Sequence, residues 1–92
     1  MSCTEADWLR WLPAALGDNF HKIHADANKG HAGVRIGDGA LGLKWQVEEP
    51  RTIGGLIRMP CLRVQFRFAG VEDALRLAFM VRFDLYMQRG GG

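Results

Sequence analysis

The last third of the chain changes its hydrophobic period within a few residues. Between residues 62 and 68 apolar positions alternate with charged or polar ones, which predicts a strand with one apolar face. From Val71 to Arg89 the apolar residues recur at helical spacing instead, and this run ends at the glycines of positions 90–92. The two patterns predict a strand that is followed directly by a long C-terminal helix.

The preceding residues predict one helix and then a series of short strands. Thr4, with Asp7 three residues later, resembles a capping box. Apolar residues then follow at helical spacing as far as Gly17, with a kink or restart expected at Pro13. Turn residues separate the expected strands, which cover residues 20–25, 34–36, 41–47, 53–59 and 62–68. Spacings of about 8–12 residues leave no room for crossover helices, so the strands should pair as antiparallel hairpins.

This order of elements predicts an α+β fold in two layers. We expect an N-terminal helix, a four- to five-stranded antiparallel sheet and a long C-terminal helix. Because a helix before five short strands also occurs in Sm-like barrels, a curled barrel with an added C-terminal helix is the alternative. A chain of 92 residues suits a single domain, with residues 1–3 and 90–92 expected to be mobile.

Composition narrows the possible functions. The hydrophobic content of 48% is that of a globular protein, and the net charge of +2 falls short of the basic excess typical of nucleic-acid binders. Two cysteines, Cys3 and Cys61, suit free thiols in a reducing cytoplasm. Neither a signal-peptide pattern nor an apolar run of about 20 residues is present, so we expect a cytoplasmic protein without a membrane partner.

The predicted C-terminal helix is apolar around nearly twice the arc of about 100° that packing on one sheet requires. We expect the sheet to be covered by its smaller residues, which are Val71, Ala74, Leu75, Ala78, Val81 and Leu85. The adjoining face carries larger residues, which are Phe79, Met80, Phe83, Tyr86 and Met87. The first helix covers this second face, or the face forms a subunit interface, since such residues are typical of interface cores, and the two explanations can hold together. If it is an interface, a charged residue at Phe83 or Met87 should yield a folded monomer.

Arginines form a second candidate surface. Arg63 and Arg67 lie on the strand face opposite the apolar one, and Arg58 and Lys44 join them if the neighbouring strands pair in register. A basic sheet face of this kind can follow a phosphate backbone, although it can also be simply a solvated surface. Arg82 projects from the apolar face of the C-terminal helix, so it must extend to solvent, pair with a carboxylate, or contact an anion or a partner.

The remaining motifs are weaker. His21, His24 and His31 lie within eleven residues and are candidate zinc ligands, but on a strand His21 and His24 point to opposite faces. Residues 37–42 match G-x-G-x-x-G, yet a strand follows them where a dinucleotide site needs a helix, so a hairpin turn is favoured. No nucleophile with a base and no paired carboxylates are found, so we predict no catalytic residue and no cofactor.

These patterns favour a small, non-catalytic interaction or accessory domain that forms a homodimer through its C-terminal helix. Its partner is a second copy or another protein. The first alternative is a nucleic-acid-binding module that uses the basic sheet face. The second alternative is a metal-binding protein that uses the three histidines.

Overall fold

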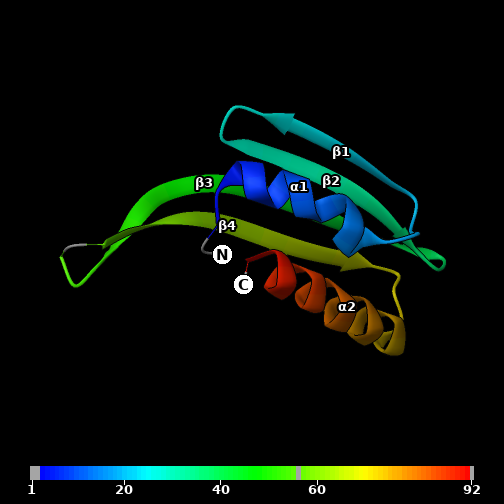
Figure 1. The fold of residues 1–92 in the computed structure, drawn as a ribbon. Helices are drawn as coiled ribbons and strands as arrows, with labels where there is room; N and C mark the ends of the chain where they lie inside the picture. Colours follow the sequence, from blue (N-terminus) through cyan, green and yellow to red (C-terminus); the bar gives the residue numbers. More distant parts are fainter. Residues whose placement is uncertain (1–2, 56, 92) are drawn as a thin grey trace.

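The computed structural model describes residues 3–55 and 57–91. Two helices flank four strands along the chain (Figure 1), namely α1 (Glu5–Leu16), β1 (His21–Asp26), β2 (Lys29–Ile36), β3 (Gly39–Ile53), β4 (Ile57–Ala69) and α2 (Asp73–Gly91). The strands form one antiparallel sheet in the order β1-β2-β3-β4. The predicted α+β fold is confirmed. The curled barrel is wrong, because β1 and β4 lie at opposite edges of an open sheet.

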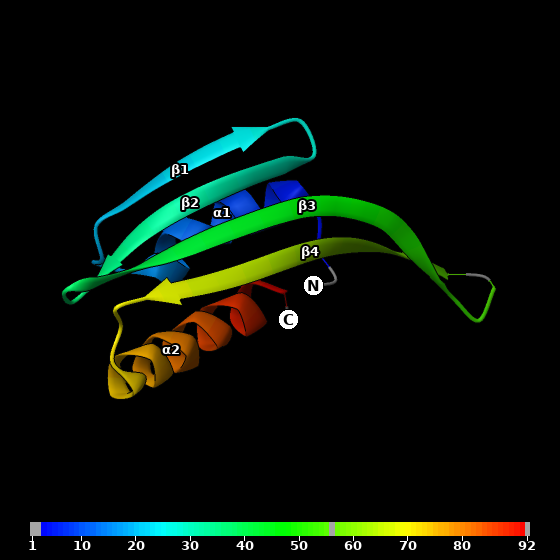
Figure 2. The same ribbon diagram turned by 180° about the vertical axis from the view of Figure 1, so that it is seen from behind.

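Both helices lie on one face of the sheet, which gives the fold two layers. In Figure 1, α1 crosses β2 and β3 and α2 runs along β4, whereas Figure 2 shows the strands from the side that no helix covers. We call this uncovered side the open face. The alternation in β2 follows from the two environments, since Ala32, Val34 and Ile36 are buried beneath the helices and the residues between them are exposed.

The sheet has four strands because two expected breaks do not end a strand. β3 runs through Pro50, and β4 runs through Pro60. The pairing of these two strands shifts register between Glu48 and Arg51. Both prolines lie in this irregular stretch, where neither has to donate a ladder hydrogen bond. The separate strand expected at residues 53–59 is therefore wrong: Ile53 ends β3, and residues 57–59 begin β4, at the far end of one long hairpin.

That hairpin extends beyond the rest of the sheet. β2 pairs with β3 only as far as Gln46, and the N–H of Val47 donates to the carbonyl of Asn28 at 2.7 Å. Beyond this point β3 and β4 continue as a two-stranded ribbon that projects away from the helices (Figure 1). Ile57, near the tip, is exposed.

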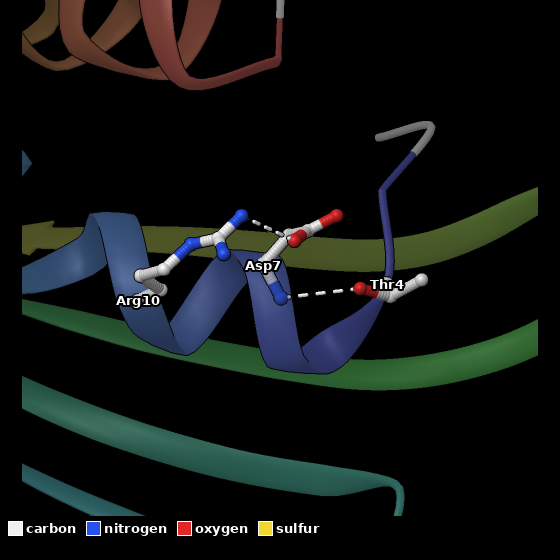
Figure 3. A network of polar contacts seen from close by, with 3 residues as sticks. All are labelled: Thr4, Asp7 and Arg10. Atoms are coloured by element: carbon white, nitrogen blue, oxygen red, sulfur yellow. Dashed lines mark hydrogen bonds and ion pairs between the residues drawn. The ribbon is translucent and has the colours of Figure 1, made fainter.

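Local interactions fix both ends of α1. The N–H of Asp7 donates to Oγ1 of Thr4 at 3.1 Å, and Oδ1 of Asp7 lies 2.7 Å from Nη2 of Arg10 (Figure 3). The helix ends at Gly17, whose φ of +66° lies in the region that favours glycine. The predicted cap and end are confirmed. The restart expected at Pro13 does not occur, because buried residues on both sides of the proline hold one continuous helix.

Replacing Thr4 with alanine should lower the free energy of unfolding by about 1 kcal/mol. The N–H of Asp7 would lose its acceptor at the start of α1. Urea unfolding followed by circular dichroism measures the change. Thr4→Ser is the matched control and should retain most of the stability, because it keeps the hydroxyl oxygen. Equal stability of the alanine variant would contradict a role for this cap.

Aromatic rings fill the space between the helices and the sheet. Trp8 of α1 lies 5.6 Å from Trp45 of β3 and 5.9 Å from Phe83 of α2, measured between ring centroids. Phe83 also meets Phe66 of β4 edge to face at 5.2 Å. Gly30 leaves room for this cluster, because a Cβ there would clash with the indole of Trp45. These contacts join the two helices to each other, α1 to the central strand β3, and α2 to the edge strand β4.

The orientation of α2 differs from the expected one. Phe79, Phe83 and Met87 are buried against α1 and the sheet. Val81 and Leu85, which were expected to pack on the sheet, are exposed. The physical reason is the size of the side chains. Only the large ones fill the space between α2, the tryptophans and the phenylalanines of β4.

Both ends of the chain were expected to be mobile, at residues 1–3 and 90–92. Within the first of these segments, Cys3 is buried. α2 continues through Gly91, although glycine is a poor helix former and the helix was expected to stop at Gly90. Residues 1, 2 and 92 lie outside the described residues.

Candidate functional site

α2 carries apolar side chains on two opposite faces. Its inner face packs in the core. Its outer face is formed by smaller residues, which are Ala74, Leu77, Ala78, Val81 and Leu85, and which we call the outer stripe. Val81 lies two residues from Phe83, which is about 200° around the helix. Accordingly Val81 is 60% exposed and Phe83 only 2%. The outer stripe contains no charged residue, and all five of its side chains are exposed.

The residues predicted to form a subunit interface belong to the interior of the chain. Phe79, Phe83 and Met87 are buried. Met80 and Tyr86 are half-buried and pack against the same core. Three of the five positions therefore belong to the core, and a charged residue at position 83 or 87 would enter it. The exposed apolar surface of α2 lies on the other side of the helix.

Arg82 links α2 to the end of α1. Its guanidinium carbon lies 4.8 Å from the ring centroid of Tyr86, as in a cation–π contact. The guanidinium also lies over Gly17, where a Cβ would be 2.9 Å from its Nε. α1 has no basic residue in its last turn, so Arg82 supplies positive charge near the negative end of that helix dipole. It is thus separated from Arg63 and Arg67, which lie on the open face.

Polar side chains form three transverse rows on the open face. The strand register gives their members, which are Lys22, Gly33, Gly42 and Arg67 in the first row, His24, His31, Lys44 and Gln65 in the second, and Asp26, Lys29, Gln46 and Arg63 in the third. Neighbouring rows lie about 7 Å apart, since they are two residues apart along each strand. Arg63 and Arg67 thus share the open face as predicted from the alternation. Arg58 lies farther along β4, on the projecting ribbon.

Two shallow hollows lie on the open face. One, of about 550 Å³, is lined by Gly33 and Gly42, which pair directly across β2 and β3. The other, of about 850 Å³, shares His31, Lys44 and Gln65 with the first. A Cβ on Gly33 would have no atom within 4 Å. The missing side chains of the two glycines therefore open the smaller hollow.

The three histidines do not come together. His24 and His31 stack across β1 and β2, with ring centroids 5.0 Å apart and an interplanar angle of 24°. Strand alternation places His21 on the opposite face, where its Nδ1 lies 2.8 Å from the carbonyl oxygen of Asn19. Within residues 3–55 and 57–91, no group of three or more His, Cys, Asp or Glu side chains is placed to hold a metal ion. The predicted histidine site is therefore not assembled.

The two thiols and the glycine motif of residues 37–42 form no recognisable site among the described residues. Cys3 and Cys61 are free. Burial raises the pKa of the Cys3 thiol, which keeps it protonated and poorly nucleophilic at neutral pH. Residues 37–42 form the turn between β2 and β3 and the start of β3, so no helix follows the glycines. In the described part of the chain, neither helix is long and apolar enough to cross a membrane.

The sequence interpretation missed part of the open face. It identified Arg63 and Arg67 because β4 alternates clearly. It did not place Lys22, Lys29 and Arg35 beside them, because β1 and β2 have few large apolar residues to mark the alternation. The short runs of alternating residues around Ile23 and Val34 were the available signal.

Comparison with known proteins adds no relative. No family model, no curated protein and no solved structure matches the chain. The outer stripe and the open face, which are both exposed, are therefore the basis for a functional assignment.

Proposed function

We propose that the chain is a small, non-catalytic interaction domain that forms a homodimer through the outer stripe of α2. The supporting observation is a helix face with five exposed apolar residues and no charged one. Such a continuous apolar surface is uncommon on monomers and typical of the centre of a protein–protein interface. The inner face of the same helix already packs in the core of its own chain. Only the outer stripe is left for a second chain to cover.

The order of residues in the outer stripe supports a second copy of this chain as the partner. In an antiparallel pair of α2 helices with a two-fold axis between residues 79 and 80, Leu85 faces Ala74 of the partner. Val81 then faces Ala78 of the partner. These two large side chains each meet a small one, which is how helix surfaces interdigitate, and Leu77 faces Arg82 of the partner at the edge of the pair. A two-fold axis brings the same patch of both chains together, as in most homodimers.

The cysteines support a reducing compartment for this domain. Both thiols are free, with Cys3 buried and Cys61 half-buried. Free thiols of this kind are typical of proteins that stay in the cytoplasm. We therefore place the homodimer there.

Size-exclusion chromatography with light scattering should give the wild-type protein a mass near twice 10.3 kDa. Val81→Asp should give a folded monomer, because the homodimer would bury two unpaired carboxylates at its centre. The cost of several kcal/mol exceeds what one helix face contributes. Circular dichroism on the same fractions checks that the variant is folded.

Ile57→Asp is the matched control for Val81→Asp. Both side chains are 60% exposed, but Ile57 lies near the tip of the hairpin. The Ile57 variant should remain a dimer. If it dissociates while the Val81 variant stays dimeric, the hairpin is the interface and the outer stripe is not. A wild-type protein that is monomeric at millimolar concentration would reject self-association altogether.

A further inference from the structure

We infer that the open face of the sheet binds single-stranded nucleic acid. The first observation is a segregation of charge between the two layers. Six exposed cations lie on the open face, and they are Lys22, Lys29, Arg35, Lys44, Arg63 and Arg67. Two carboxylates, Asp26 and Glu48, lie among them, so this face has a surplus of four positive charges. The net charge of +2 conceals this surplus.

The helix layer carries the opposite charge. Six carboxylates lie on the helices and at their ends, and they are Glu5, Asp7, Asp18, Glu72, Asp73 and Asp84. Three cations accompany them among the residues whose side chains are described, and they are Arg10, Arg76 and Arg82. A polyanion is therefore attracted to the open face and repelled from the helices, which orients it before contact.

Most of the open-face cations are available to a ligand. Arg63 has a carboxylate partner, with its Nε 3.0 Å from Oε1 of Glu48. Lys44 and Arg67 have no ion pair among the described residues, and they stand in neighbouring rows beside the smaller hollow. That hollow lies over Gly33 and Gly42, where the backbone is uncovered. A flexible strand can therefore follow the floor of the hollow with its phosphates near both cations.

The stacked histidines favour a single strand over a duplex or an acidic peptide. His24 and His31 present exposed imidazole rings in the same row as Lys44. Unpaired bases stack on histidine rings, whereas the bases of a duplex are hidden from them. An acidic peptide would use the cations, but it has no bases to stack on the two exposed rings. Phosphate contact and stacking are thus combined on one surface.

Fluorescence anisotropy with a labelled oligothymidine of about 20 nucleotides tests the inference, since this length exceeds the ~4–16 nucleotides that a small binding domain covers. At about 50 mM salt the wild-type protein should bind it more tightly than a duplex of the same length, and affinity should fall steeply with salt. Lys44→Glu combined with Arg67→Glu should lower affinity at least tenfold. In a plot of the logarithm of the binding constant against the logarithm of the salt concentration, the slope should also become shallower by about 1.4. This is roughly 0.7 for each lost phosphate contact.

The matched control is Arg10→Glu combined with Arg76→Glu. Both pairs of substitutions change the net charge of +2 by the same amount, to −2, but Arg10 and Arg76 are exposed on the helix layer. The control should keep affinity within about threefold of wild type. Equal losses in the two double variants would show that overall charge, and not the open face, attracts the oligonucleotide. Absence of binding at about 50 mM salt would overturn the inference.

His24→Ala combined with His31→Ala separates stacking from charge. This variant should lose about fivefold or more in affinity for the oligothymidine while the salt dependence stays unchanged, because no phosphate contact is removed. Unchanged affinity would contradict stacking, and with it the preference for a single strand. A duplex or anionic vesicles that bind at least as tightly as the oligothymidine would likewise overturn it. Circular dichroism confirms that each variant keeps the wild-type spectrum.

Discussion

Replacing Phe83 with aspartate should abolish cooperative folding, whereas replacing Val81 with aspartate should not. Phe83 is 2% exposed and contacts Trp8 and Phe66, so its loss removes a central part of the core. Truncation of a buried phenylalanine costs about 3–5 kcal/mol. An unpaired carboxylate in that space adds several kcal/mol more. The sum is comparable to the entire stability of roughly 5–10 kcal/mol expected for a chain of this size.

Thermal unfolding followed by circular dichroism distinguishes the two variants. Phe83→Asp should show no cooperative transition, and Val81→Asp should unfold cooperatively with a wild-type spectrum before heating. Phe83→Leu is a further control, because it keeps an apolar side chain and should give a cooperative transition at lower temperature. A folded Phe83→Asp variant together with an unfolded Val81→Asp variant would show that α2 packs with the opposite face.

Replacing Trp8 with alanine should be the most destabilising truncation in α1. Its side chain is 0% exposed and lies between Trp45 and Phe83. We expect a loss of about 3–5 kcal/mol in the free energy of unfolding, because the cavity would open at the junction of both helices and the sheet. Urea unfolding measured by circular dichroism gives this quantity directly.

Trp8→Phe is the informative control for this prediction. The indole Nε1 of Trp8 is buried and has no hydrogen-bond acceptor among the described residues. Phenylalanine removes this unpaired donor, which costs about 1–3 kcal/mol when buried, and keeps most of the ring volume. The variant should therefore lie within about 1.5 kcal/mol of wild type. A larger loss for phenylalanine than for alanine would contradict the packing described for this residue.

The α+β architecture follows from patterns that are clear in the sequence. The alternation around Phe66 and Phe68, the helical spacing after Val71, and the Thr4 cap each specify one element through local physics. The structure has the lower of the two expected strand numbers, because Pro50 does not end β3. The strand passes the proline with a register shift, and such a shift depends on how β3 and β4 pair and not on the residues beside Pro50 alone.

The orientation of α2 could not be read from periodicity. Helical spacing identifies which residues share a face, and both faces of this helix are apolar. The choice between Phe83 and Val81 depends on how much volume the tryptophans and the sheet leave to be filled, which is a property of the assembled core. Phe79, Phe83 and Met87, which were predicted at an interface, therefore lie in the core, and the exposed apolar surface of α2 is the outer stripe.

The open face was predictable only in part, and for a related reason. Arg63 and Arg67 could be placed together because they lie on the same strand. Lys22 joins them only through the register of three strand pairs, which no single segment encodes. The sequence pattern grouped His24 and His31 with His21, as candidate zinc ligands. Strand alternation separates His21 from them, and cross-strand pairing brings His24 onto His31.

The most direct test of the proposed homodimer is an isotope-filtered nuclear Overhauser experiment on a mixture of labelled and unlabelled chains. It detects only contacts between the two copies. The antiparallel pairing of α2 predicts contacts from the methyl groups of Leu85 to the methyl group of Ala74 in the other copy, and from Val81 to Ala78. Intermolecular contacts confined to the hairpin tip or the sheet edges, or no intermolecular contacts at all, would contradict it.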